Sequence, residues 1–214
     1  SISRIVGVHR NTITKLMFDV AAKCEEDMQV RLTGLRCERV ECDEIWTYVG
    51  KKNRRLNGDD DHRVLGDQYV FIALDADSKL IPTFTVGKRT QETAWGFIRD
   101  LGRRVDGEFQ LSTDKFNGYF RPIKWIFGSR VNYGTIHKTY HSNGHYERSS
   151  YSPSRLKAAI KEISFGIPEI RKICTSYVER SNLTIRMQLS RFTRLTNAFS
   201  KKLDHLIAML TVYF

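Results

Sequence analysis

Three acidic residues occur in an order that could support metal-dependent chemistry on a phosphodiester. Asp43 lies within a stretch of alternating apolar and polar residues, Asp114 directly follows a short apolar stretch, and Glu179 lies near the start of a helical pattern. Phosphoryl transfer from a phosphodiester uses two divalent ions, which stabilise the attacking and the leaving oxygen. Mg²⁺ prefers oxygen ligands, so carboxylates rather than Cys or His should hold it. We therefore predict that these three carboxylates bind two divalent ions.

Asp43 also has a structural interpretation and two acidic neighbours. Asp is depleted within strands, so Asp43 needs a metal or a cation to face, unless it points to solvent from an edge strand. Glu41 shares a strand face with Asp43 and is its most plausible rival as a ligand. Glu44 points to the opposite face, where we expect a surface or ion-pair residue.

Asp114 and Glu179 have helix-capping alternatives. Asp114 follows the predicted strand at the carboxyl end, where functional residues of open sheets gather, but it could also cap the next helix. Ser176 and Glu179 fit a capping box, in which the Glu179 carboxylate accepts a hydrogen bond from the Ser176 amide. The order of strand, strand end and helix favours a common site over three separate structural roles.

The elements that must position these carboxylates follow from the periodicity of the sequence. An alternating pattern predicts a strand at 38–49, and a long polar loop at 50–67 separates it from strands at 68–75 and 80–86, which gives an antiparallel meander. The later elements are a helix at 90–105, a strand at 109–112, a helix at 116–127, a strand at 131–136 and helices from about 176, including one at 175–193. This order predicts an α/β fold, a ribonuclease-H-like mixed sheet with flanking helices.

Residues 1–30 have a helical period that Gly7 interrupts. The pattern resembles the second half of a helix-turn-helix, in which a glycine permits the tight turn. An ordinary pair of amphipathic helices with a solvated basic face is the alternative. We divide the chain into a partial helix-turn-helix at 1–30, a connector at 31–38 and a catalytic domain at 39–214. The residues that would face DNA from the helical segment are Arg10, Asn11, Thr14 and Lys15.

The charge of the chain indicates a polyanionic partner. Lys and Arg number 35 against 24 Asp and Glu, a formal net charge of +11, and the isoelectric point of about 9.6 is typical of nucleic-acid-binding domains. Phosphate contacts supply most non-specific DNA affinity. Arg186 is the best candidate because it shares a helix face with Glu179. A solvated basic face is the alternative for each of the further candidates, which are Lys51, Lys52 and Arg180.

Several classes of protein are not expected. No run of 18 or more apolar residues and no signal-peptide core occurs in the sequence, so we predict no membrane span and a cytoplasmic location. The four cysteines form no CxxC pair, which argues against a zinc site and a disulfide framework. His137, His141 and His145 recur every four residues, but the polar, Gly-containing stretch around them argues against the helix that zinc binding would need.

The segments that contain the three carboxylates resemble the DDE transposases of the insertion sequence 1 group and its relatives. The resemblance rests on DEIWTYVGKK at 43–52, ALDADSKLIP at 73–82, STD at 112–114, TSYVERSNLTIR at 175–186 and RFTRLTNAFSKK at 191–202. It covers essentially residues 40–205 and, more loosely, the N-terminal helices. The segment around Glu179 is the most specific of these motifs.

This resemblance implies a ribonuclease-H-like core whose acidic ligands are Asp43, Asp114 and Glu179, and a transposition reaction that depends on Mg²⁺ or Mn²⁺. The implied partners are double-stranded DNA, as terminal inverted repeats and as target, and further copies of the chain in a synaptic complex. A nucleoid-associated location follows. Relatives of this group carry more sequence at both ends, so we expect a chain truncated at both ends.

Two other functions remain open on the sequence. A ribonuclease-H-like nuclease or junction resolvase would need the same metals but would release only hydrolysed DNA. A domesticated transposase that acts as a DNA-binding regulator would use residues 1–30 and carry a silent core. The three intact carboxylates favour an active enzyme.

Overall fold

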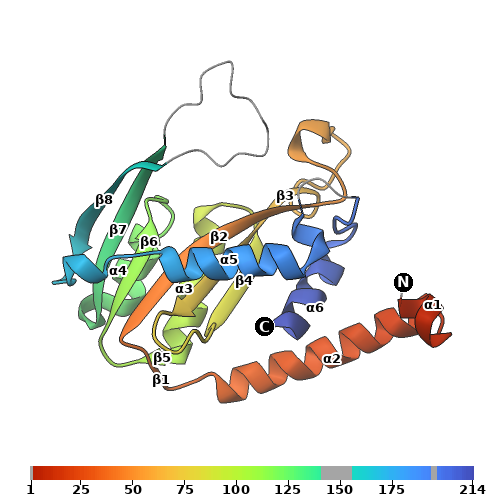
Figure 1. Cartoon of the computed structure of the whole chain (residues 1–214), viewed down its shortest axis with the longest axis horizontal. Coiled ribbons are helices and arrows are strands. Elements are labelled where there is room, and N and C mark those ends of the chain that lie inside the picture. Colours follow the sequence, from red (N-terminus) through yellow and green to blue (C-terminus); the bar gives the residue numbers. More distant parts are fainter. Residues whose placement is uncertain (1, 141–155, 194–196) are drawn as a thin grey trace.

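The computed structural model describes residues 2–140, 156–193 and 197–214 (Figure 1). In this part of the chain the main element is a mixed sheet of six strands in the order β4-β3-β2-β6-β7-β8. Its strands are β2 (Arg39–Val49), β3 (Gly66–Asp75), β4 (Thr83–Gly87), β6 (Phe109–Asp114), β7 (Val131–Tyr140) and β8 (Leu156–Phe165).

The first three strands of this sheet form the predicted antiparallel meander. β2 pairs with β3 from Val40↔Asp75 to Val49↔Gly66, and β3 pairs with β4. β4 starts later than the predicted strand because the chain first completes a turn, in which the Asp75 amide donates to the Leu80 carbonyl over 2.8 Å. The meander places Asp43 in the middle of a strand that has neighbours on both sides.

The other half of the sheet begins with parallel pairing. β6 lies parallel to β2 on one side and to β7 on the other. β7 continues to Tyr140, beyond the predicted end at residue 136, because β8 pairs with it antiparallel. β8 was not predicted from the sequence; it is an edge strand in which Leu156, Ile160 and Ile163 are exposed. An edge strand exposed on both faces lacks the alternation by which strands are predicted.

Helices cover both faces of the sheet. On one face α3 (Gln91–Arg104) and α4 (Phe120–Phe127) pack in one apolar cluster. On the other face α5 (Ser176–Gln188) and α6 (Leu203–Tyr213) pack in a second cluster, and α5 crosses the sheet over β2 (Figure 1). The chain therefore has the predicted α/β architecture of a mixed sheet with flanking helices.

Local sequence explains where α3 starts and which of its faces is buried. The Thr90 hydroxyl caps α3 by accepting a hydrogen bond from the Thr93 amide over 3.3 Å. Ala94, Ile98 and Leu101, at helical spacing, are buried beneath it. α5 ends earlier than predicted, at Gln188, and a short 3₁₀ helix, η4 (Ser190–Phe192), follows it.

The N-terminal residues form two helices, α1 (Ile2–Val6) and α2 (Arg10–Arg31), and Gly7 between them has a φ of 67°, a conformation that favours glycine. α2 lies against α6, where the rings of Phe18 and His205 meet edge to face at 5.1 Å. Two short strands, β1 (Leu35–Arg36) and β5 (Val105–Asp106), pair in parallel. The division of the chain at residues 30 and 38 stays a prediction.

The remaining short elements are the 3₁₀ helices η1 (Asn53–Arg55), η2 (Gly128–Arg130) and η3 (Ile170–Lys172). Among the described residues, no helix combines the length and the apolar character that crossing a bilayer requires.

Candidate metal centre

Parallel pairing brings the first two predicted ligands side by side. The pairing of β2 with β6 ends at Cys42↔Thr113, so the next residues of the two strands are Asp43 and Asp114. A cavity of about 790 Å³ opens there, and Glu179 reaches its wall from α5. The structure thus brings together all three carboxylates that the sequence analysis selected.

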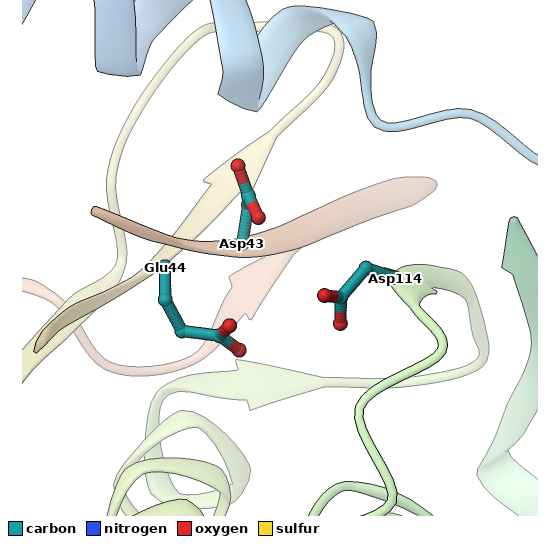
Figure 2. Close-up of side chains that lie close together, drawn as sticks. All are labelled: Asp43, Glu44 and Asp114. Atoms are coloured by element: carbon teal, nitrogen blue, oxygen red, sulfur yellow. The ribbon is translucent and has the colours of Figure 1, made fainter. Parts of the chain in front are cut away.

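A fourth carboxylate belongs to the same cluster. Asp43, Glu44 and Asp114 each offer one oxygen, and these oxygens lie within 4.8 Å of one another (Figure 2). This spacing suits hard divalent ions, which take carboxylate oxygens at 2.0–2.6 Å. The chemistry of these donors therefore fits a divalent ion such as Mg²⁺.

Glu44 lies in the protein interior and not on its surface. Figure 2 shows Asp43 and Glu44 on opposite sides of the strand, as the alternation predicts. The side chain of Glu44 is only 3% exposed, however, and the predicted ion pair forms with Arg89. Helices cover both faces of β2, so the face opposite Asp43 is also part of the core. The Glu44 Oε1 atom is buried and has no hydrogen-bond partner among the described residues.

Arg89 bridges two of these carboxylates. Its Nε lies 3.0 Å from Glu44 Oε2 and its Nη2 lies 2.9 Å from Asp114 Oδ2. The guanidinium also stacks over the Phe116 ring, 4.3 Å from its centroid. Arg89 was not predicted as a site residue, because it lies in the loop before α3, outside every motif. Its charge offsets that of the acidic cluster.

Glu179 is held in a different way from the other carboxylates. Its Oε1 accepts a hydrogen bond from the Thr175 hydroxyl over 2.6 Å and forms an ion pair with the Lys138 ammonium group. The capping-box alternative was wrong, since the Ser176 amide points to the sulfur of Cys174. Glu179 lines the cavity but is not part of the tight cluster.

Glu41, the proposed rival of Asp43, has a structural role. Its side chain is buried, and Oε2 accepts hydrogen bonds from the backbone amides of Tyr177 at 2.8 Å and Val178 at 3.0 Å. These amides belong to the first turn of α5, whose positive end a carboxylate stabilises. Glu41 thus fixes the end of the helix that carries Glu179.

Asn182 holds the Asp43 carboxylate in place. Its Nδ2 donates to Asp43 Oδ2 over 2.8 Å, and its side chain is buried between α5 and the sheet. Asn182 follows Glu179 by three residues, which puts both on one helix face. The three-residue spacing from Glu179 was the feature of the sequence that indicated a polar side chain directed at the site.

Crowding of carboxylates changes the protonation of the site. Burial raises the pKa of Asp43 to about 7, and the negative charge of Glu44 adds to this shift, with smaller contributions from Asp114 and Glu179. Burial also raises the pKa of Glu44, followed by repulsion from Asp114. Divalent ions would relieve both repulsions.

This shift predicts a pH-dependent stability in the absence of metal. The pKa of Asp43 is higher in the folded chain than the ordinary value of 3.8, so the folded state binds more protons between these values. Stability should therefore fall as the pH rises from about 4 to 7. In EDTA, we expect a larger decrease of Tm between pH 5 and pH 8 for the wild type than for Asp43→Asn. An equal decrease in both proteins would contradict the shift.

The basic residues predicted to bind DNA do not lie at one site. Arg186 is half-buried on the wall of the carboxylate cavity, and Arg180 is exposed on the same helix. Lys51 forms an ion pair with Asp60 at 2.7 Å. The Lys52 ammonium group lies over two aromatic rings of β2, 5.9 Å from the centroid of Trp46 and 5.6 Å from that of Tyr48.

The N-terminal candidates lie apart from this cavity. Arg10, Asn11 and Thr14 line a separate groove, and Lys15 forms an ion pair with Asp19 at 2.7 Å. Their contact with DNA stays a prediction.

β7 and the loop after Asp114 also line the carboxylate cavity. Lys115 lines it and forms an ion pair with Glu162 at 2.8 Å. His137 lines it as well, while His141 and His145 lie outside the described residues. Two lysines, Lys115 and Lys138, thus supply positive charge at the rim of an acidic centre.

Comparison of the sequence with models of known protein families gives no match, and a search of curated proteins gives none. The proposal below therefore depends on the site itself, a cavity lined by three carboxylates and several basic side chains, with the Glu44 carboxylate close to two of the three.

Proposed function

We propose that this chain is a DNA transposase with a ribonuclease-H-like core, which cuts and joins DNA ends by metal-dependent phosphoryl transfer. The observation that carries the proposal is the convergence of Asp43, Asp114 and Glu179, distant in sequence, on one cavity. The order of the sheet supports the fold assignment, since an antiparallel meander is followed by two parallel strands. The sequence motifs around the same three residues support transposition as the reaction.

The residues present define how the site would hold its ions. Asp43, Asp114 and Glu179 would be the ligands, and Glu44 adds a fourth carboxylate beside them. Two bound divalent ions would stabilise the attacking and the leaving oxygen of the phosphodiester. Asn182 keeps the Asp43 carboxylate oriented toward the cavity.

Basic side chains around the cavity would position the DNA. Arg89 and Lys138 neutralise carboxylates in the structure, and both line the cavity, where they can turn to the oxygens of a phosphate. Arg186 lines the same cavity from α5. Basic side chains of this kind bind DNA phosphates and fix the position of the DNA strand, but they do not distinguish between base sequences.

The products of the wild-type protein test the proposal. Labelled duplexes from the DNA that flanks the gene would be incubated with the protein and Mg²⁺, and resolved on denaturing gels. Transposition predicts cut ends that carry a 3′-hydroxyl and also joined DNA. Cut DNA without any joined product would replace the proposal with a nuclease or resolvase. Bound but uncut DNA would indicate a regulator with a silent core.

A further inference from the structure

A second cavity, of about 670 Å³, lies beyond the C-terminal end of α5. We call it the α2 groove, since the first turns of α2 form one wall. The other wall comes from residues of η4, from described residues between 198 and 202, and from the start of α6. The lining residues are Arg10, Asn11, Thr14, Ser190, Arg191, Ala198, Phe199, Lys201, Lys202 and His205.

The α2 groove concentrates positive charge that the described protein does not balance. Arg10, Arg191, Lys201 and Lys202 line it, and no carboxylate from the described part of the chain does. Within the described ranges, none of these four cations lies in an ion pair, although Lys15 on the same helix does. Like charges at this density repel one another unless an anion binds between them. The groove therefore fits a ligand with several negative charges.

The walls of the α2 groove are fixed to the catalytic body. Arg191 is half-buried and donates from Nη1 to the Ser200 hydroxyl over 3.2 Å. The Ser200 carbonyl accepts a hydrogen bond from the Gly50 amide at 2.8 Å, which attaches this wall to the end of β2. α2 is held by its contact with α6. Arg191 is thus preorganised, and the backbone next to the exposed Lys201 and Lys202 is attached to the sheet.

The shape of the groove distinguishes between two ways of contacting DNA. Base reading needs an element that projects into the major groove, which is about 12 Å wide. Arg10, Asn11 and Thr14 instead line a concave surface together with Arg191 and Lys202. A sugar–phosphate backbone can lie in such a surface, whereas base edges cannot reach its floor.

We infer that the α2 groove binds the phosphate backbone of duplex DNA, at a place separate from the carboxylate cavity, and does so without regard to sequence. The choice of DNA as the polyanion rests on the proposed function. The carboxylate cavity extends along α5 from Thr175 to Arg186, and the α2 groove lies beyond the C-terminal end of this helix, at Ser190 and Arg191. A bound duplex would thus be held at a second point away from the scissile bond.

The test is the salt dependence of DNA binding in EDTA, which excludes cleavage. Fluorescence anisotropy would measure the affinity of the wild type and of Arg191→Gln/Lys202→Gln for two 30-bp duplexes of unrelated sequence. The logarithm of the association constant falls linearly with the logarithm of the salt concentration, and each lost phosphate contact makes this slope shallower by about 0.9. The slope of the double variant should therefore be shallower by about 1.8. Its affinity for both duplexes should fall equally, by tenfold or more at low salt.

The matched control is Arg103→Gln/Lys124→Gln, which removes the same charge from α3 and α4 on the other face of the sheet. Its slope should stay within about 0.5 of the wild-type value. Unchanged Tm and Mn²⁺ binding would show that the groove variant is folded. An unchanged slope, or a loss confined to one sequence, would overturn the inference. Binding through the groove by a protein that never cuts DNA would instead refute only the proposed function.

Discussion

Asp114→Asn is expected to slow DNA cleavage and joining about a thousandfold while the protein stays folded. Asp114 is partly exposed, and its Oδ1 accepts the Phe116 amide, a contact that the Asn oxygen can keep. What the variant loses is one negative charge at the proposed metal centre, together with the ion pair between Asp114 and Arg89. Stabilisation of the transition state by a metal is worth several kcal/mol, and about 4 kcal/mol corresponds to a thousandfold in rate. Asp43→Asn and Glu179→Gln should have effects of similar size.

Single-turnover assays with Mg²⁺ would measure this loss, and calorimetric titration with Mn²⁺ would show whether metal binding weakens in parallel. Glu108→Gln is a suitable control, because Glu108 is an exposed carboxylate just before the same strand. It should keep the wild-type rate. Full activity in all three carboxylate variants would rule out the proposed centre.

Glu41→Ala is expected to lower the free energy of unfolding by about 3 kcal/mol. The Glu41 carboxylate is buried and accepts hydrogen bonds from two backbone amides at the start of α5. Its removal leaves both donors without a partner, and hydrogen bonds to charged groups contribute about 1.5–3 kcal/mol each. For a chain of this size, the loss corresponds to a decrease of about 10 °C in Tm. Metal binding should weaken too, because α5 carries Glu179.

Thermal unfolding followed by circular dichroism would test this second prediction. Glu38→Ala serves as the control, since Glu38 is exposed immediately before the same strand. Glu41→Gln should lose less, because its amide oxygen can still accept one of the two hydrogen bonds. A Tm for Glu41→Ala equal to that of Glu38→Ala would show that the cap does not stabilise the helix.

The sequence predicted the fold best where burial differs between the two faces of an element. β2, β3 and α3 have strong periodic patterns, and the structure contains all three. β8 was missed because Lys157, Ala158 and Ala159 are residue types depleted in strands and because both of its faces are exposed. The apolar stripe of α5 continues through Leu189 and Phe192, so periodicity alone placed the end of this helix too late.

The site was predictable only in its acidic residues. Residue type and order selected Asp43, Asp114 and Glu179, but alternation could not reveal that the face of Glu44 is covered. The role of Arg89 could not be predicted, because its two partners lie on different strands and only the tertiary structure brings them together. The cap on α5 joins residues 136 positions apart, a contact that no local pattern encodes.

That long-range cap has a consequence for the newly made chain. Glu41 and Asp43 leave the ribosome long before α5 does, and synthesis proceeds at roughly 5–20 residues per second. Until α5 has emerged, Asp43 lacks the hydrogen bond from Asn182, and Glu179 is absent. A nascent chain therefore carries an incomplete centre for several seconds. On the proposed function, the capacity to cut DNA would arise only after α5 has been made and has packed onto the first strands.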